Sequence, residues 1–504
     1  MPLEADPANF DDHEMIDETL LAKVREKVRF AGLWAPQMPT DRGGLGLNTV
    51  GMAVFYEEAA RSRFGPLTFN CSAPDDGNMI LLDRVGREDQ KDQWLQPIID
   101  GKVRSSIVMT EPAPGSGSDP TMMLTRAEIQ GNDKWVINGR KWFITNAAHP
   151  HCRLIILMGK TDPEAARHNQ QSMVLIPIDA AGVKIVRNIR IMNHHAPEGH
   201  CEIVFDNVRV PVSNLLGQEG SGFTLAQARL GPGRIHHCMR SIGAAELAVE
   251  LMIARSKQRQ TFGKNLHEHG AVTDWIARSR IEIEQARLLV LKTAWLIDER
   301  GAQNARKEIA MIKALVPNLH VTVIDRAMQL FGAMGISPDT PLADHWTWGR
   351  ALRYADGPDE VHLRSVARAM AQTRSAAPAR RNLSSIIDAD SGKMATQGVQ
   401  LVHTQLLTGA PASGVRPRPM DAAAGPPPRD LLVDGGFPKT LGPFGLRTAE
   451  RRLEEQMLRR QVEAAGRVHY SRPPQPWDIA ADLEAVHAPH LVGALARLAF
   501  AKGV

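Results

Sequence analysis

The sequence predicts an α+β fold made of three consecutive domains: a helical N-terminal domain, a small β domain and a C-terminal helical bundle. Three observations support this prediction. Amphipathic helical patterns fill residues 1–107, short β-rich runs fill 108–216, and helical periodicity returns over 217–375. From residue 376 to 504 the composition shifts to Pro, Gly, Ala and Arg, which predicts a linker and tail.

Each block is predicted from its own periodicity. Four helical patterns separated by Gly and Pro turns occupy the first block, at 16–30, 50–60, 79–85 and 90–99. Five β-rich runs predict a small antiparallel barrel or sandwich in the second, at 106–110, 134–145, 153–158, 173–178 and 202–210. In the third, the apolar face is clearest between Val272 and Leu296, with Gly301 as the predicted stop. Two further helical patterns lie in the tail, at 448–465 and 479–501.

Composition excludes several classes of protein. A chain of 504 residues with 43% apolar side chains can form two or three domains with sizeable cores. Its 60 Lys and Arg residues are interspersed with 56 Asp and Glu residues, which argues against a nucleic-acid partner. Four widely spaced cysteines without a CxxC pair indicate reduced thiols, no metal site and a cytoplasmic protein. No apolar run predicts a secretory signal or a membrane span.

The stretch 353–364 carries the first candidate for chemistry. Gly357 and Pro358 end one helical pattern, and Asp359 or Glu360 can cap the next. The carboxylate before this turn, Asp356, is therefore aimed by the local backbone, as a general base must be. On turn statistics alone, an Asp before Gly-Pro is more often a helix cap than a base.

Six motifs follow one another in a fixed order. They are Met-Thr-Glu-Pro (109–112) with Gly-Ser-Gly-Ser-Asp (115–119), Asn-Gly-Arg-Lys-Trp-Phe-Ile-Thr-Asn (138–146), Phe-Asp-Asn-Val-Arg-Val-Pro (205–211), Gly-Arg-Ile-His-His-Cys-Met-Arg (233–240), Arg-Gln-Thr-Phe-Gly-Lys (259–264) and Gln-Leu-Phe-Gly-Ala-Met-Gly (329–335). In this order the chain, from about residue 15 to 375, resembles the acyl-CoA dehydrogenase family. The 233–240 string and Ala-Asp-Gly-Pro-Asp-Glu-Val-His (355–362) resemble most the branch of family members 10 and 11.

The resemblance implies FAD as cofactor and assigns the ring-binding residues. A flavin needs hydrogen-bond donors at its pyrimidine edge and a flat apolar wall. The matched positions for the isoalloxazine ring are Met109, Thr110, Phe143, Ile144 and Thr145, with Gly357 and Pro358 beside the ring. Without the resemblance, Trp142-Phe143 is ordinary strand core.

Two further groups are implied in the same way. Arg259 and Phe262 match residues that reach the pyrophosphate and adenine of a neighbouring subunit's flavin, with Gln329, Gly332 and Gly335 close to the same dinucleotide. This sharing implies an obligate homo-oligomer, a dimer or tetramer, although the 259–263 string alone is typical of a helix end.

On the substrate side, the resemblance implies Ser118, Arg234 and Gly357 near the acyl-CoA. His236 and His237 have no partner evident in the sequence, and we expect packing or solvated histidines.

The chain departs from the family in three places. The base, Glu in most straight-chain members of this type, is Asp356, whose side chain is shorter by one C–C bond, roughly 1.5 Å. The loop after Glu111-Pro112 is two residues longer, and Gly270 stands where many members have Gln near the adenine.

The resemblance predicts an FAD-dependent acyl-CoA dehydrogenase of fatty acid β-oxidation that makes a trans-2-enoyl-CoA. Asp356 would remove the α-proton while hydride leaves to flavin N5, and an electron-transfer flavoprotein would accept the electrons. Burial under substrate is expected to raise the pKa of this carboxyl. Two alternatives stay open. One is an oxidase, since a fold relative that oxidises nitroalkanes also uses Asp as its base, and the other is a non-catalytic flavin-binding assembly factor.

Overall fold

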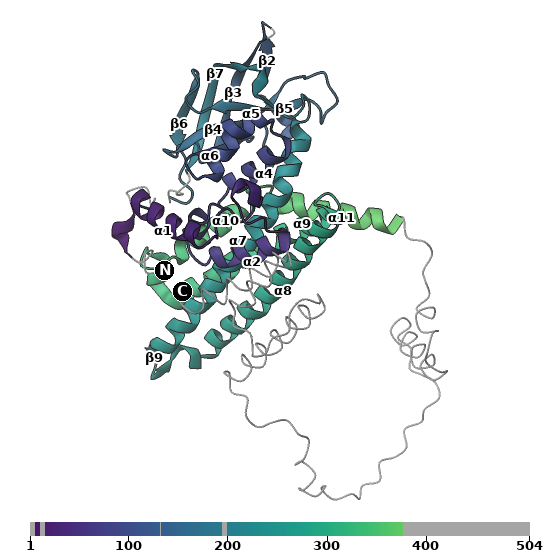
Figure 1. Cartoon of the computed structure of the whole chain (residues 1–504). Coiled ribbons are helices and arrows are strands. Elements are labelled where there is room, and N and C mark those ends of the chain that lie inside the picture. Colours follow the sequence, from purple (N-terminus) through teal and green to yellow (C-terminus); the bar gives the residue numbers. More distant parts are fainter. Residues whose placement is uncertain (1–5, 11–15, 132, 194–198, 376–504) are drawn as a thin grey trace, which may run out of the picture. The chain divides into compact units, whose positions relative to one another are not determined.

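A computed structural model describes residues 6–10, 16–131, 133–193 and 199–375. The elements that position the candidate site belong to one compact unit within Met1–Ala369. Helices come first, strands follow and long helices return, which confirms the predicted α+β class (Figure 1). The predicted linker and tail helices after residue 376 lie outside the described residues.

Six α-helices occur among the described residues of the N-terminal block: α1 (Glu18–Phe30), α2 (Thr49–Ala59), α3 (Gly65–Thr68), α4 (Asp75–Val85), α5 (Glu88–Gln90) and α6 (Gln96–Ile99). Side chains cap the first two, since Asp17 accepts a hydrogen bond from the Leu20 N–H and Asn48 accepts one from the Gly51 N–H, both at 2.8 Å. Helix α4 begins four residues before its apolar pattern. Its first residues, Asp75 and Asp76, are buried carboxylates, which a search for apolar periodicity does not detect.

Among the described residues, eight strands form one sheet: β1 (Arg104–Val108), β2 (Arg126–Gln130), β3 (Lys134–Thr145), β4 (Cys152–Lys160), β5 (Gln171–Pro177), β6 (Val183–Asn188), β7 (His200–Pro211) and β8 (Leu215–Leu216). Three of these strands, β2, β6 and β8, were not predicted. Most side chains of β2 and β6 are partly or fully exposed, so these strands lack the apolar run that marks the predicted ones, and β8 has only two residues.

The prediction of a wholly antiparallel sheet was wrong at β1. This strand pairs with β4 in parallel register, Ser106 beside Ile155 and Val108 beside Leu157. A parallel pair needs a long connection, because the chain must return to the same end of the sheet. Part of that connection is the loop that follows β1 and carries the Gly-Ser-Gly-Ser-Asp motif at 115–119.

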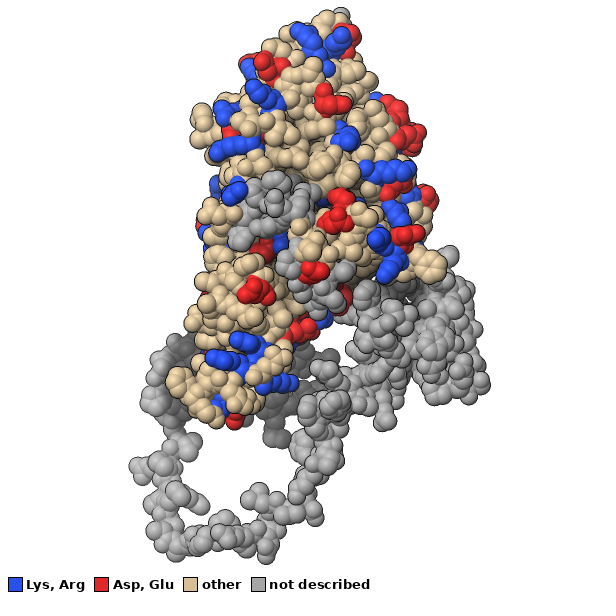
Figure 2. Space-filling view, turned by 90° about the vertical axis from the view of Figure 1, so that its left-hand side faces the viewer, with Lys and Arg blue, Asp and Glu red and all other residues tan. Residues whose placement is uncertain are grey.

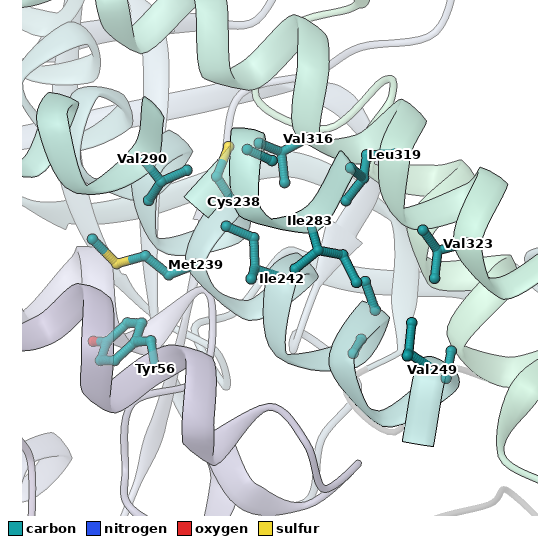
Figure 3. Packing of buried hydrophobic residues seen from close by; sticks show 14 of the residues in the cluster. Tyr56, Cys238, Met239, Ile242, Val249, Ile283, Val290, Val316, Leu319 and Val323 are labelled. Carbon is teal, nitrogen blue, oxygen red and sulfur yellow. The ribbon is translucent and has the colours of Figure 1, made fainter. Parts of the chain in front are cut away.

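Five helices form the C-terminal bundle: α7 (Gly222–Gln258), α8 (Gly270–Arg300), α9 (Arg306–Phe331), α10 (Leu342–Leu352) and α11 (Asp359–Ser375). Helix α8 ends where predicted, with Gly301 at φ +76° as its cap. Apolar side chains from α2, α7, α8 and α9 interlock in one core cluster (Figure 3). Within it, Ile242 of α7, Ile283 of α8 and Val316 of α9 are fully buried.

The surface carries both signs of charge. Figure 2 shows Lys and Arg interspersed with Asp and Glu over the face that it presents. None of the described helices has an apolar stretch long enough to cross a membrane.

Gly243 sets the closest approach between α7 and α2. A Cβ at this position would lie 1.9 Å from the Glu57 carbonyl oxygen, so the helices would have to separate. We expect Gly243→Ala to lower the free energy of unfolding by about 1–3 kcal/mol or more, measured by denaturant titration. The control is Gly270→Ala, at the start of α8, where a Cβ meets nothing within 4 Å. That variant should match or slightly exceed the wild-type stability, and equal stability of both variants would contradict the prediction.

Candidate active site

Asp356 lies in the turn between α10 and α11 and has a strained backbone. Its φ is +56°, a conformation that costs a non-glycine residue about 1 kcal/mol or more. Two basic side chains hold the turn in place. Arg234 Nε donates to the Asp356 carbonyl oxygen at 3.0 Å, and the buried Lys313 Nζ donates to the Leu352 carbonyl oxygen at 2.6 Å. The turn is therefore built to aim one side chain.

The buried oxygen Oδ2 of the Asp356 carboxylate has no hydrogen-bond partner among the described residues. Oδ1 lies 3.9 Å from Arg229 Nη1, and Oδ2 lies 3.5 Å from His237 Nε2 without bonding geometry to any described group. The side chain is 13% exposed. A Cβ at Gly233 would come within 3.1 Å of Oδ2, so this glycine keeps space open in front of the oxygen. A buried carboxylate with a free oxygen can accept a proton.

Four basic residues surround this carboxylate: His237, Arg229, Arg234 and Lys313. Burial by itself would raise the pKa of Asp356. The His237 ring and the cations Arg229, Arg234 and Lys313 together outweigh burial and hold the pKa below its ordinary value. The expected rise concerns the substrate-bound state, so it stays a prediction, and without substrate the shift runs the other way.

The two other acids of this turn have different roles. Asp359 accepts hydrogen bonds from Arg353 Nε at 2.8 Å and Asn318 Nδ2 at 3.0 Å, so it fixes the start of α11. Glu360 is exposed. Asp356 is thus the acid of this turn that faces the buried basic residues.

His236 and His237 are both buried, so neither is solvated. His236 Nδ1 lies 3.1 Å from Asp76 Oδ2, and Arg240 donates to the same carboxylate oxygen at 2.9 Å. Arg240 Nη2 also lies 3.3 Å from His237 Nδ1. These partners could not be predicted from the sequence, because Asp76 lies far upstream, on α4, and gives no local signal.

The predicted flavin-contacting residues Met109 and Thr110 directly follow β1, and a buried ion pair holds this segment. Lys141 Nζ lies 3.0 Å from Glu111 Oε1 and donates to the Met109 carbonyl oxygen at 2.9 Å. Glu111 also accepts from the Thr125 N–H at 2.8 Å. Ser118 lies exposed in the loop that this pair anchors.

The end of β3 presents the other predicted ring contacts. Phe143 has φ +52° and is 47% exposed, as a wall for a flat ligand must be. Ile144 differs, because its side chain is 2% exposed in the β-domain core and only its backbone is available. Thr145 Oγ1 lies 3.2 Å from His200 Nδ1.

Ring contacts connect the end of β3 to the surroundings of Asp356. The His200 and Trp348 rings stack with centroids 6.3 Å apart, and Trp348 meets the His237 ring edge-on at 6.5 Å. A cavity lies here, with His200, Trp348 and Arg240 among its lining residues. The structure therefore brings Thr145 and Asp356 to the same region, although they are far apart in sequence.

The second predicted group lies elsewhere. Arg259 ends α7, and Phe262 in the hairpin after it is 97% exposed with φ +53°. Gln329 and Gly332 are exposed at the end of α9, and Gly335 is buried, where a Cβ would lie 2.5 Å from the Met328 carbonyl oxygen. At a rise of 1.5 Å per residue, α7 separates Gly233 from Gln258 by about 38 Å.

Three family models match consecutive parts of the chain. The N-terminal, middle and C-terminal domains of acyl-CoA dehydrogenase match residues 4–102, 106–208 and 220–371. Together they cover well over half of the chain, and the chain belongs to the acyl-CoA dehydrogenase family.

Individual relatives agree with this assignment. The probable acyl-CoA dehydrogenase FadE2 of Mycobacterium tuberculosis is 50% identical over 72% of this chain and 90% of that protein. Acyl-CoA dehydrogenase family member 11 of Gallus gallus is 48% identical over 69% of this chain, and this confirms the similarity to that branch. The chain spans only 45% of the length of the Gallus protein.

Solved structures share the fold. A putative acyl-CoA dehydrogenase from Mycobacterium abscessus is 46% identical, with a TM-score of 0.68 over 70% of this chain and 87% of that one. A structure of PigA with FAD and proline is 25% identical, with a TM-score of 0.63 over 71% of this chain and 94% of that one.

A substitution in the buried Glu111–Lys141 pair tests whether this pair holds the segment after β1, with Met109 and Thr110, in the form that binds FAD. We expect Lys141→Met to lower the free energy of unfolding by about 3–5 kcal/mol, because it leaves Glu111 charged and buried. FAD content, read from the absorbance spectrum, should fall with it. The matched control is Arg167→Met, which removes an ion pair to Asp119 whose side chains are 67% and 45% exposed. This control should cost about 0–1 kcal/mol, and an equal loss in both variants would contradict a special role for the buried pair.

Proposed function

We propose that this chain is an FAD-dependent acyl-CoA dehydrogenase that converts an acyl-CoA thioester to a trans-2-enoyl-CoA. The observation that carries the proposal is the Asp356 carboxylate, held by a strained turn with Oδ2 free of hydrogen bonds. Family membership supplies the reaction class, and this geometry supplies a base for it.

FAD fits the residues at the two strand ends. The segment after β1 and the half-exposed Phe143 offer backbone groups and a flat apolar wall, and Thr145 adds a hydroxyl. When bound, the flavin supplies the acceptor for the hydride that leaves the substrate β-carbon. Met109, Thr110 and residues 143–145 would hold its ring system, with Gly357 and Pro358 on the other side.

The chain's own residues carry the proton chemistry. Asp356 Oδ2 takes the α-proton, while the backbone N–H of Asp356 helps to hold the thioester oxygen and so makes that proton more acidic. Arg234 keeps the turn in position through the Asp356 carbonyl. We place Ser118, Arg234 and Gly357 along the CoA side of the substrate.

The partners follow from the distance along α7. Helix α7 separates Gly233, beside the base, from Gln258, next to Arg259, by about 38 Å. We infer that one FAD does not span this distance. The flavin of a neighbouring subunit, in a dimer or tetramer, would instead be served by Arg259, Phe262, Gln329, Gly332 and Gly335. An electron-transfer flavoprotein would accept the electrons, within fatty acid β-oxidation. The cytoplasmic location predicted from the cysteines stays a prediction.

Asp356→Asn is the direct test of the base. It keeps the shape of the side chain and removes the proton acceptor, so anaerobic flavin reduction by a panel of acyl-CoAs should slow at least about a hundredfold. Absorbance near 450 nm reports the reduction, and FAD content should be unchanged. Asp356→Glu should retain partial activity.

The control for that test is Glu360→Gln, because Glu360 is an exposed acid of the same turn. It should reduce flavin at the wild-type rate. If Glu360→Gln abolishes reduction while Asp356→Asn does not affect it, the base is Glu360 and the assignment is wrong.

The shared flavin predicts an effect at the exposed Phe262. We expect Phe262→Ala to weaken FAD binding about three- to tenfold, the scale of one lost aromatic contact. Phe30→Ala is the control, since Phe30 is 95% exposed at the end of α1, a helix that contains none of the predicted site residues. Equal FAD affinity in both variants, measured by titration of the apoprotein, would argue against the neighbour's site.

One observation favours a second candidate reaction. Asp in place of Glu at the base position is also the feature that suggested an oxidase of the same fold. The reoxidation of the reduced protein by oxygen separates the two functions. A dehydrogenase should reoxidise slowly in air and rapidly with an electron-transfer flavoprotein, whereas rapid reoxidation by oxygen alone would favour the oxidase.

A further inference from the structure

Arg240 determines which ring nitrogen of His237 can carry a proton. A guanidinium donates hydrogen bonds and accepts none, and Arg240 Nη2 lies 3.3 Å from His237 Nδ1. Nδ1 must therefore be the acceptor. In a neutral imidazole the remaining nitrogen, Nε2, then carries the hydrogen, and Nε2 is the atom 3.5 Å from Asp356 Oδ2.

His237 is neutral at working pH. Its side chain is 8% exposed, and burial lowers its pKa to about 3. Groups from four helices face the His237–Asp356 pair: Arg229, Arg234 and Arg240 from α7, Asp76 from α4, Lys313 from α9, and His362 from α11. Of the four basic residues around Asp356, Arg229, Arg234 and Lys313 are cations. Their positive charge also disfavours a second proton on His237.

Arg240 is itself fixed. Its Nη1 donates to Asp76 Oδ2 at 2.9 Å and to the Cys71 carbonyl oxygen at 2.8 Å. Burial by itself would lower the pKa of Arg240, but the Asp76 carboxylate outweighs it, and the pKa is raised. The guanidinium therefore stays charged, and its orientation toward His237 does not depend on solvent.

We propose that His237 is a positioning residue for the base, and that its Nε2–H donates to one lone pair of Asp356 Oδ2 once the substrate closes the site, which leaves the other lone pair of this oxygen for the α-proton. The inference rests on the proposed function, in which Asp356 is the base. Catalytic hydrogen bonds are often long before the substrate binds, which fits the present 3.5 Å separation. The bond would keep the carboxylate ionised and turned toward the α-proton.

The test compares two variants of His237 in the FAD-loaded protein. His237→Gln keeps an N–H near the position of Nε2, and His237→Leu removes the donor without adding charge. The readout is the pH dependence of anaerobic flavin reduction, whose acid limb reports protonation of Asp356. A donor stabilises the carboxylate and lowers its pKa, so its loss raises that pKa and moves the acid limb to higher pH.

We expect His237→Leu to move the acid limb upward by about one pH unit, the scale of one hydrogen bond to a charged group. His237→Gln should stay within a few tenths of a unit of wild type. The control is His236→Asn, which keeps a donor toward Asp76 and should not move the limb. An unmoved limb in a folded, yellow His237→Leu protein overturns the inference, while Asp356 remains the base.

A second measurement does not depend on activity. Histidine ¹⁵N NMR of the oxidised holoprotein at pH 7, assigned with His237→Gln, should show the neutral tautomer with hydrogen on Nε2. A hydrogen on Nδ1, or a doubly protonated ring, overturns the inference. If wild-type flavin is not reduced by any acyl-CoA, the proposed function fails, and the tautomer still decides the role of Arg240.

Discussion

Helix α7 is the constraint on which the rest of the structure depends. It runs unbroken from Gly222 to Gln258 and packs against α2, α8 and α9 in the main core. Its first half presents Arg229, Arg234 and His237 to the base, and its last residue leads into the hairpin of Phe262. Because a rigid helix fixes the distance between its ends, the two groups of predicted site residues are held far apart within one chain. In the proposed function, an oligomer would bring them to one flavin.

Pairing of buried charges distinguishes the base from the acids around it. Asp75 is bound by Arg104, Asp76 by Arg240 and Glu111 by Lys141, each at a distance of 2.9–3.0 Å. A buried carboxylate that is fully paired is held in one geometry and cannot readily accept a proton. Asp356 differs because its basic neighbours stand 3.5–3.9 Å away from the carboxylate oxygens. It is stabilised as an anion and yet keeps an open lone pair.

Local patterns in the sequence predicted the parts of the fold and site that are themselves local. The buried strands, the Gly301 stop and the turn around Asp356 each leave a signal within a few residues. The parallel pairing of β1 and the partners of His237 leave none, because both depend on segments brought together from distant parts of the chain. Burial of Asp76 and Lys313 was equally hidden, since their partners, Arg240 and the Leu352 carbonyl, come from distant parts of the chain. Sequence patterns alone therefore located the turn that carries Asp356, but not the distant residues that surround its carboxylate.

In the proposed enzyme–substrate complex, the cations around Asp356 limit how far the pKa of its carboxyl rises. Substrate binding removes water from Asp356, which raises the pKa. The cations do not leave with the water, because Arg234 is bound to the Asp356 carbonyl and Lys313 to the Leu352 carbonyl. These contacts are to backbone oxygens of the turn itself, so the cations move with the carboxylate. The rise on binding is therefore smaller than for an aspartate buried among apolar groups, and the base stays ionised down to a lower pH.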